Sequence, residues 1–361
     1  MPQDNLSQII SAFRLENAVG EPKPLKVGLI NDSYILPSAH EGGKKYFLQR
    51  INHHIFTNVE GLQRNIQIVT DHIRHKLETA GVTDINNRVL RLIETTDGAL
   101  YHKTPAGNYW RVYEFVEGRS LERVTPESAN LAGVAFGQFQ NQLSDLPHSS
   151  LCESIPNFHN IEYRLQQLRE AVEANAANRL SHCKDLLASI MHRADDMCLS
   201  ERLFREGKLT KRINHCDTKV NNILFDENNH PLCIVDLDTV MPGFVFSDFG
   251  DFMRTAANTG AEDDKDLSNI HVDMEVFKAY TQGYLSQADF LTDIERSLLP
   301  YGCRLLSYMQ TVRFFTDWLN GDTYYKIQYP EHNLVRTRAQ LRLLEEQEHA
   351  AKDMEALINE L

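Results

Sequence analysis

The 361-residue sequence lacks the paired cysteines and histidines that mark common metal and redox sites. Its six cysteines include no C-x-x-C pair, and the shortest gap between two of them is fifteen residues. This spacing excludes zinc-knuckle and dithiol redox motifs, and scattered thiols favour a reducing compartment over a disulfide framework. No helical pattern carries the H-x-x-x-H spacing of a zinc site.

The sequence also has fewer basic than acidic residues. Lys and Arg number 37 against 50 Asp and Glu, a formal net charge of −13. Nucleic acids and anionic membranes need a basic surface, so we expect neither as a partner. No apolar run approaches the roughly 18 residues of a membrane span, and the N-terminus shows no basic region followed by an apolar run. We expect a cytoplasmic protein; the charged amphipathic helix from Asn333 onward leaves a monomer or a weak dimer open.

The apolar pattern changes about one third of the way along the chain. Before Gly118, short apolar runs between turn signals predict strands at 26–36, 45–51, 89–93, 100–102 and 109–116. One helix interrupts them at 59–80. After Gly118, helical patterns dominate, at 126–143, 161–172, 178–204, 274–285, 298–318 and from 333 onward, with one β-like stretch at 222–238. We predict an α+β chain with a β-rich lobe, residues 1–117, and a helical lobe, residues 118–361.

The β-like stretch and the residues before it carry an ordered set of metal-binding side chains. Asp217 is followed five residues later by Asn222, which opens an apolar strand, and Asp236 ends a second apolar strand. Turn-forming residues 228–231 lie between the strands, so a hairpin would return Asp236 to Asn222. Magnesium prefers such oxygen ligands, and a carboxylate beside an acceptor hydroxyl can take its proton. Protein kinases use the same order of Asp, Asn and Asp.

This match suggests a role for each residue. Asp217 is the candidate base, and Asn222 and Asp236 are the candidate magnesium ligands. Asp238 shares a strand face with Asp236 and is a candidate for a second metal or for orientation. Each residue alone could be a surface residue of a turn-rich hairpin, but the full ordered set favours phosphoryl transfer.

The same segments resemble a known superfamily. His215-x-Asp217-x-x-x-x-Asn222, followed by Ile234-Val235-Asp236, is similar to the aminoglycoside phosphotransferases and choline kinases. The segments 215–222, 235–243, 248–254, 259–264 and 313–322 resemble most closely the N-acetylhexosamine 1-kinases, and the likeness covers nearly the whole chain.

This resemblance implies a bilobal protein-kinase-like fold, with ATP and Mg²⁺ as cofactors. The implied reaction is phosphorylation of the anomeric hydroxyl of N-acetylglucosamine or N-acetylgalactosamine. A kinase for choline, homoserine, methylthioribose or an aminoglycoside is the alternative. A catalytically silent nucleotide-binding protein is a different class; it would be expected to lack one of Asp217, Asn222 and Asp236, and all three are present.

The resemblance also implies phosphate contacts in the first lobe. Residues 28–34 take the place of the phosphate-covering loop, where backbone N–H groups and the Ser33 hydroxyl would meet the phosphates. N-acetylhexosamine kinases tend to carry His where this chain has Leu29. Arg50 takes the place of an arginine that would pair with the α- and β-phosphates; a solvated arginine at a strand end is the alternative.

Adenine contacts are implied at the end of the first lobe. Glu114, Phe115 and Val116 resemble the hinge whose backbone hydrogen-bonds adenine. An edge strand followed by a turn glycine is the simpler interpretation. The position between a β-rich and an α-rich half favours the hinge.

Acceptor contacts are implied in the second lobe. Besides Asp217, Arg313 and Tyr324 are the candidate sugar-binding residues, with Tyr325 a weaker neighbour. An ion pair of Arg313 with Asp317 at i+4, or packing of the tyrosines, is the alternative.

Three further residues have implied supporting roles. Asp251 would brace the loop that carries Asp217. His215 would orient the backbone of that loop. Lys219 would approach the γ-phosphate or remain in solvent.

Overall fold

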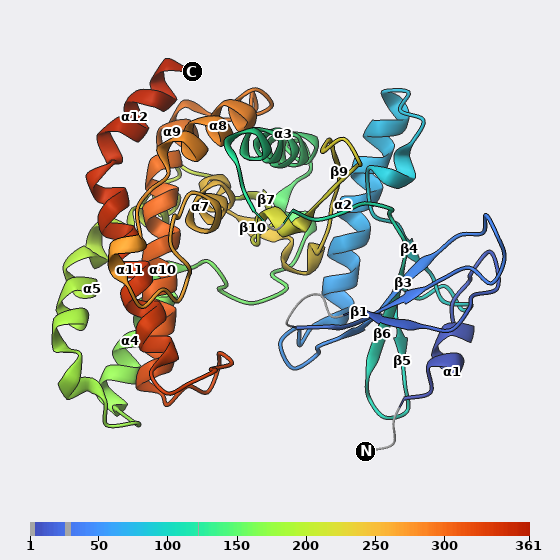
Figure 1. Ribbon diagram of the computed structural model, residues 1–361, viewed down its shortest axis with the longest axis horizontal. Coiled ribbons are helices and arrows are strands. Elements are labelled where there is room, and N and C mark those ends of the chain that lie inside the picture. Colours follow the sequence, from blue (N-terminus) through green and yellow to red (C-terminus); the bar gives the residue numbers. More distant parts are fainter. Residues whose placement is uncertain (1–3, 26–29, 122) are drawn as a thin grey trace. The chain divides into compact units, whose positions relative to one another are not determined.

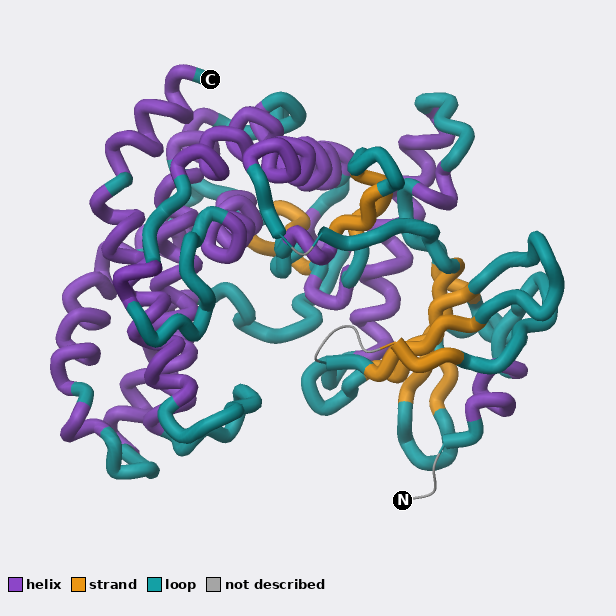
Figure 2. The backbone as a smooth tube through the Cα atoms, viewed as in Figure 1, coloured by secondary structure: helices purple, strands orange, loops and turns teal. Residues whose placement is uncertain are grey.

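The computed structural model of the protein describes residues 4–25, 30–121 and 123–361, and the chain forms two compact units (Figure 1). Unit 1 comprises Met1–Ser120, Asp145–Pro156 and Ile223–Met241; unit 2 comprises Leu121–Ser144, Asn157–Asn222 and Pro242–Leu361. The predicted change from strands to helices is confirmed (Figure 2). The lobe boundary at residues 117/118 stays a prediction.

An antiparallel sheet forms the centre of unit 1, with the strand order β1-β2-β3-β6-β4 and with β5 paired to β6. Its apolar face packs against α1 through Leu36, Leu48 and Val112. The phosphate-loop segment predicted at 28–34 is described only from residue 30, so Leu29 lies outside the described residues. The elements are α1 (Leu6–Ser11), β1 (Lys23–Leu25), β2 (Asp32–Leu36), β3 (Tyr46–Ile51), β4 (Leu92–Ile93), β5 (His102–Lys103) and β6 (Tyr109–Glu114).

Helix α2 (Val59–Thr79) confirms the helix predicted from its apolar spacing. Its N-terminus is capped by Asn58, whose side chain accepts the Gly61 N–H. Buried Asn65 donates to the carbonyls of Cys152, at 2.7 Å, and Val240, at 3.0 Å. These hydrogen bonds tie three distant segments of unit 1 together.

The predicted hairpin is confirmed. Strands β8 (Ile223–Phe225) and β9 (Pro231–Ile234) pair antiparallel, with Ile223 opposite Ile234. A short 3₁₀ turn, η5 (Leu237–Thr239), follows Asp236. Gly118 lets the chain pass the hairpin, because a Cβ there would lie 3.0 Å from the Leu224 Cβ.

Unit 2 is built from helices. The helix predicted over 178–204 begins only at residue 184, because Asn178 adopts the left-handed conformation with φ 54°, and it is interrupted at Cys198. In the described part of the chain, no helix has both the length and the apolar character to span a membrane. The helices are α3 (Pro126–Gln142), α4 (Ile161–Ala174), α5 (Lys184–Met197), α6 (Leu199–Arg205), α7 (Val245–Ala256), α8 (Met274–Leu285), α9 (Asp293–Ser297), α10 (Leu299–Leu319), α11 (His332–His349) and α12 (Ala351–Glu360), with β7 (Arg212–Asn214) paired to β10 (Met241–Gly243).

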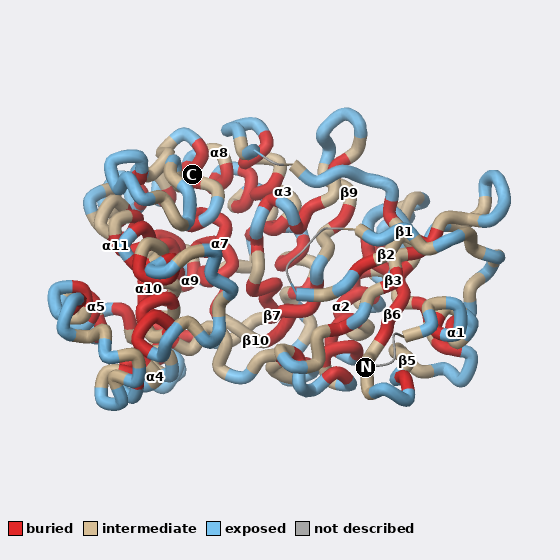
Figure 3. Tube along the Cα trace, turned by 60° about the horizontal axis from the view of Figure 1, so that its bottom comes forward, coloured by how far each residue is buried: buried red, intermediate tan, exposed pale blue. Residues whose placement is uncertain are grey.

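Helices α7 and α10 cross at the centre of unit 2, and both are largely buried (Figure 3). Glycines allow their backbones to touch. A Cβ on Gly250 would lie 2.1 Å from the Gly302 carbonyl oxygen, and a Cβ on Gly302 would lie 2.2 Å from that of Phe246. This contact leaves the opposite face of α7 to carry polar side chains.

We expect Gly250→Ala to lower the free energy of unfolding by about 1–3 kcal/mol, because overpacking a dense interior costs about that much. Ser247→Ala on the same helix is the control and should change it by less than about 0.5 kcal/mol. Its buried hydroxyl has no hydrogen-bond partner within the described residues. Denaturant titration followed by circular dichroism measures both; a Gly250→Ala protein as stable as the control would contradict the close crossing.

Candidate active site

The loop at residues 214–222, here called the Asp217 loop, is fixed by a buried carboxylate on α7. Asp248 accepts the backbone N–H of His215 through Oδ2, at 2.7 Å, and that of Cys216 through Oδ1, at 2.8 Å. Gln140 donates to Oδ2 at 2.9 Å. Cys216 has φ 63°, a conformation that costs a non-glycine residue about 1–3 kcal/mol. The two hydrogen bonds offset this strain and set the direction of the loop.

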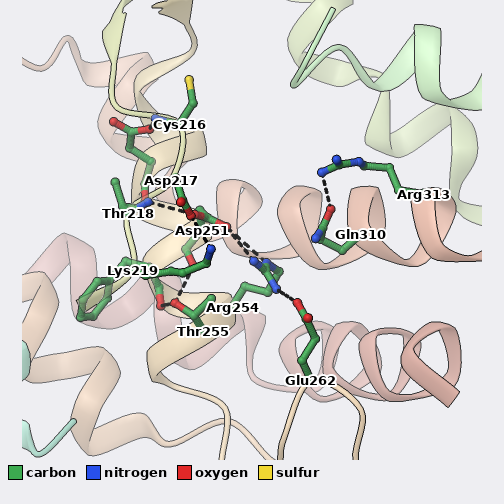
Figure 4. Close-up of polar contacts among 12 residues, drawn as sticks. Cys216, Asp217, Thr218, Lys219, Asp251, Arg254, Thr255, Glu262, Gln310 and Arg313 are labelled. Atoms are coloured by element: carbon green, nitrogen blue, oxygen red, sulfur yellow. Dashed lines mark hydrogen bonds and ion pairs between the residues drawn. The ribbon is translucent and has the colours of Figure 1, made fainter. Parts of the chain in front are cut away.

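A second acid on the same face of α7 braces the loop further. Asp251 accepts the Thr218 N–H at 3.0 Å, and the Thr218 hydroxyl donates to the Asp248 carbonyl at 2.6 Å. Arg254 donates to Asp251 at 3.0 Å and pairs with Glu262 at 2.8 Å (Figure 4). Burial opposes ionisation of Asp251, but the Arg254 guanidinium holds the pKa of this carboxyl below its usual value. Asp251 therefore stays ionised and accepts the hydrogen bond from the loop.

The Asp217 carboxylate contacts two other residues of its loop, Asn222 and Lys219. The Asn222 amide nitrogen donates to the Asp217 carbonyl at 2.8 Å and to its carboxylate at 3.2 Å. Lys219 forms an ion pair with the other carboxylate oxygen at 2.8 Å. Partial burial opposes the charge on Lys219, but Asp217 raises its pKa, so the lysine is protonated. Lys219 thus contacts the candidate base directly, a contact that the sequence did not indicate.

His215 is buried, with its ring edge against Phe136 and Phe139, both at 5.9 Å between ring centroids. Its backbone N–H is held by Asp248. These contacts suit the supporting role implied by the sequence.

The second acidic segment lies in unit 1. Asp236 follows β9 in the left-handed conformation, with φ 59°. Asp238 is 3% exposed and is ion-paired with Arg111, at 2.5 Å, while Asn31 donates to its other oxygen at 2.7 Å. Both oxygens of Asp238 are therefore engaged by protein groups, and its metal-binding role stays a prediction.

Arg111 belongs to a row of polar side chains on one face of the sheet. It donates to Gln49 Oε1 at 2.8 Å, and Gln49 donates to the Ser33 hydroxyl at 3.1 Å. Burial opposes the charge of Arg111, but Asp238 holds its pKa above the usual range. Our sequence analysis missed Arg111. The available signal was its place between the apolar residues Trp110 and Val112 in the predicted strand.

The other predicted nucleotide-binding residues lie in unit 1. Arg50 is half-exposed and pairs with Asp32, its neighbour across the sheet, at 2.7 Å, which is the solvated arrangement named as the alternative. The N–H groups of Glu114 and Phe115 donate to the carbonyls of residues 91 and 45. The N–H of buried Val116 has no such partner among the described residues.

The acceptor candidates lie in unit 2. Arg313 on α10 donates to Gln310 Oε1 at 2.7 Å, and its guanidinium lies 6.0 Å from the Tyr324 ring centroid, a ring that is largely exposed. The alternative ion pair with Asp317 is wrong. Asp317 instead accepts the N–H groups of Thr323, Tyr324 and Tyr325, so its charge anchors the turn after α10.

Comparison with known proteins identifies the family. Residues 21–296 match a family model described as the phosphotransferase enzyme family. The chain belongs to this phosphotransferase family. Its members' chemistry transfers a phosphoryl group, which agrees with the architecture of the Asp217 loop.

Solved structures share the fold of this phosphotransferase. An aminoglycoside phosphotransferase from Alicyclobacillus acidocaldarius has a TM-score of 0.64 at 12% identity, with 100% of this chain and 98% of that chain covered. Spectinomycin phosphotransferase, solved with ADP and spectinomycin, has a TM-score of 0.60 at 14% identity, with 96% and 99% covered. Ethanolamine kinase from Plasmodium vivax has a TM-score of 0.54 at 13% identity, with 89% and 82% covered. The predicted kinase-like fold is confirmed.

We expect Arg111→Leu to destabilise unit 1 of the phosphotransferase by about 3–5 kcal/mol, because it leaves a buried carboxylate without its cation. Arg111→Leu combined with Asp238→Asn should recover part of that loss. Arg50→Leu is the control and should cost less than about 1 kcal/mol, since its pair is exposed. Denaturant titration measures all three; a double variant no more stable than Arg111→Leu would contradict this account of the pair.

The pH dependence should report on Asp248. Burial raises the pKa of Asp248 to about 6, against the opposing influence of His215 and the loop N–H groups. Because the folded pKa lies above the unfolded one, ionising this group costs stability as the pH rises from about 4 to about 6. The ionised form is nevertheless the one that accepts both loop N–H groups, so we expect kcat to fall below a pH of about 6.

The matching variant is Asp248→Asn, whose amide presents a donor to one of the two loop N–H groups. We expect kcat to drop about a hundredfold, since small misplacements of catalytic groups have effects of that size. Its pH profile should lack the acidic decline. If kcat of Asp248→Asn, measured at saturating substrates, also fell below a pH of about 6, the decline would have to come from another group.

Proposed function

We propose that this protein is an ATP-dependent kinase that phosphorylates the anomeric hydroxyl of N-acetylhexosamines, N-acetylglucosamine or N-acetylgalactosamine, to give the 1-phosphate. The observation that carries the proposal is the Asp217 loop, in which the candidate base is oriented by Asn222 and Lys219 on a backbone fixed by two buried acids. The ADP in the spectinomycin phosphotransferase structure supports a nucleotide donor.

In the proposed reaction, the anomeric oxygen attacks the γ-phosphorus of ATP. A new O–P bond forms, and the bond from the γ-phosphorus to the β–γ bridging oxygen breaks, so that ADP leaves with the electron pair. The hydroxyl proton goes to the Asp217 carboxylate. Asn222 donates to one carboxylate oxygen and Lys219 pairs with the other, so both hold the carboxylate in one orientation.

Asn222 and Asp236 are the proposed magnesium ligands. Asn222 uses its amide nitrogen toward Asp217, which leaves Oδ1 as the oxygen for a metal. Asp236, at the end of the β8–β9 hairpin, would be the carboxylate ligand. The residues described contain no group of three or more His, Cys, Asp or Glu suited to a metal, so the nucleotide phosphates would complete the coordination, as is usual for Mg²⁺. Bound magnesium would neutralise charge on these phosphates.

The nucleotide would use contacts from unit 1. Ser33, at the end of the polar row, and Arg50 are the proposed phosphate-binding residues. The backbone from Glu114 to Val116 is the proposed adenine contact, with the N–H of Val116 as donor.

The sugar assignment is supported by the motif segments in the C-terminal half, and Arg313 and Tyr324 are the proposed sugar contacts. Another small hydroxyl acceptor is the alternative: choline, homoserine, methylthioribose or an aminoglycoside. The names of two similar proteins, the Plasmodium ethanolamine kinase and the spectinomycin phosphotransferase, indicate small hydroxyl compounds as their acceptors.

The test is to incubate the protein with Mg-ATP and each candidate acceptor and to identify the product by phosphorus NMR. We expect a sugar 1-phosphate from an N-acetylhexosamine. Asp217→Asn should lower kcat by about 10²–10⁴-fold, the usual contribution of a general base. A phosphate on any other position, or an unchanged rate for Asp217→Asn, would contradict the proposal.

A further inference from the structure

Two arginines and an aromatic ring form a cluster in unit 2, here called the arginine cluster: Arg164, Arg313 and Phe158. Arg164 donates to the Phe158 carbonyl at 2.9 Å, and the Arg313 guanidinium lies 5.1 Å from the centroid of the Phe158 ring. Both guanidinium groups thus contact one residue. They are half-buried neighbours that protrude from different helices, α4 and α10.

No carboxylate of the described residues compensates the charges of the cluster, although the Arg313 guanidinium lies over aromatic rings. Among the residues described, neither Arg164 nor Arg313 forms an ion pair with a carboxylate; their acceptors are carbonyl and amide oxygens only. Arg254 nearby differs, since it pairs with both Asp251 and Glu262. Burial and, next to it, the charge of Arg313 lower the pKa of Arg164 to about 10. The pair therefore repel each other in the absence of a ligand.

Two further polar groups beside the cluster lack partners. The buried Nδ1 atom of His159 and the buried hydroxyl of Tyr325 have no hydrogen-bond partner within the described residues. Burial lowers the pKa of His159 to about 4, so this ring is neutral at pH 7 and adds no charge. The cluster thus has two buried polar atoms beside it that no described residue satisfies.

The cluster lies beside the Asp217 loop. His159 is close enough to Asp251 and to Arg313 to feel the charge of both. In Figure 4 the guanidinium of Arg313 points from α10 toward the side on which Asp217 and Lys219 lie. The carboxylates of Asp217 in the loop and of Asp251 on α7 are already paired, with Lys219 and Arg254 respectively. An acceptor held against Asp217 would therefore meet the arginine cluster.

We infer that the arginine cluster selects acceptors that present an uncharged or anionic oxygen and excludes acceptors that carry an ammonium group. The inference rests on the proposed function and narrows its substrate class. Guanidinium groups donate to carbonyl and hydroxyl oxygens in a fixed fork, whereas a cation placed beside them is repelled. An acetamido group satisfies the cluster; the free amine of the same sugar, choline and aminoglycosides do not.

The experiment compares N-acetylglucosamine with glucosamine, which differ in whether the nitrogen is acylated or an ionisable amine. At a pH where the amine is protonated, we expect kcat/KM to favour the acetylated sugar by about tenfold or more, since like-charge contacts are strongly unfavourable. Raising the pH through the pKa of the glucosamine amine removes its charge, so the ratio of the two kcat/KM values should become smaller for the same protein.

The variants are Arg164→Gln and Arg313→Gln, each with Arg202→Gln as the control, a half-exposed arginine on helix α6 of the same unit. Each cluster variant should lose kcat/KM for N-acetylglucosamine and gain it for protonated glucosamine, which narrows the ratio about tenfold. The control should leave the ratio unchanged. A variant that damages packing alone would lower both rates by the same factor, and that result would contradict selection by charge.

The outcomes separate the two proposals. If both sugars give 1-phosphates at equal kcat/KM, the inference fails and the proposed function stands. If choline or an aminoglycoside is phosphorylated in place of the sugars, both fail. If no acceptor is phosphorylated, the proposed function fails, and the inference that rests on it fails too.

Discussion

The buried carboxylate of Asp248 is the interaction on which the rest of the site depends. It accepts two successive backbone N–H groups, from His215 and Cys216, and thereby holds Cys216 in a left-handed conformation. The direction of the chain at Asp217 follows from this turn. Asp248 reaches the loop because α7 packs directly on α10 through Gly250 and presents its polar face to the loop. The packing of α7 on α10 therefore helps to fix the position of the Asp217 side chain.

Charge pairing organises the remaining acids. Asp217, Asp251 and Asp238 each have a basic partner, respectively Lys219, Arg254 and Arg111. Pairing offsets the cost of placing charged groups in surroundings where isolated charges would be unfavourable. Arg164 and Arg313 of the arginine cluster depart from this pattern, because neither has a carboxylate partner among the described residues. This difference is the physical basis for assigning them to an incoming ligand.

The sequence predicted those parts of the site that depend on local chemistry. The β8–β9 hairpin followed from turn-forming residues between two apolar runs, and α8 was predicted at its observed bounds. The order of Asp217, Asn222 and Asp236 was itself visible. Local spacing carries this information because strands, turns and helices are set largely by neighbouring residues.

Side-chain pairing over long distances was not predictable in the same way. Arg111 looks like an ordinary strand arginine until Asp238, 127 positions later, is placed beside it. The i+4 spacing of Arg313 and Asp317 suggested an ion pair, but backbone N–H groups of the following turn take the Asp317 carboxylate. The helix expected over 178–204 forms as α5 and α6 but begins later than expected, because left-handed Asn178 cannot be part of a helix. Tertiary contacts decided each case.

We propose that Asp236 binds the metal that accompanies ATP, while Asp217 acts on the acceptor alone. Calorimetric titration of ATP with and without Mg²⁺, into Asp217→Asn and Asp236→Asn, tests it most directly. We expect Asp217→Asn to keep the Mg²⁺-dependent affinity of the unaltered protein and Asp236→Asn to lose it. Equal Mg²⁺ dependence in both variants would contradict the account.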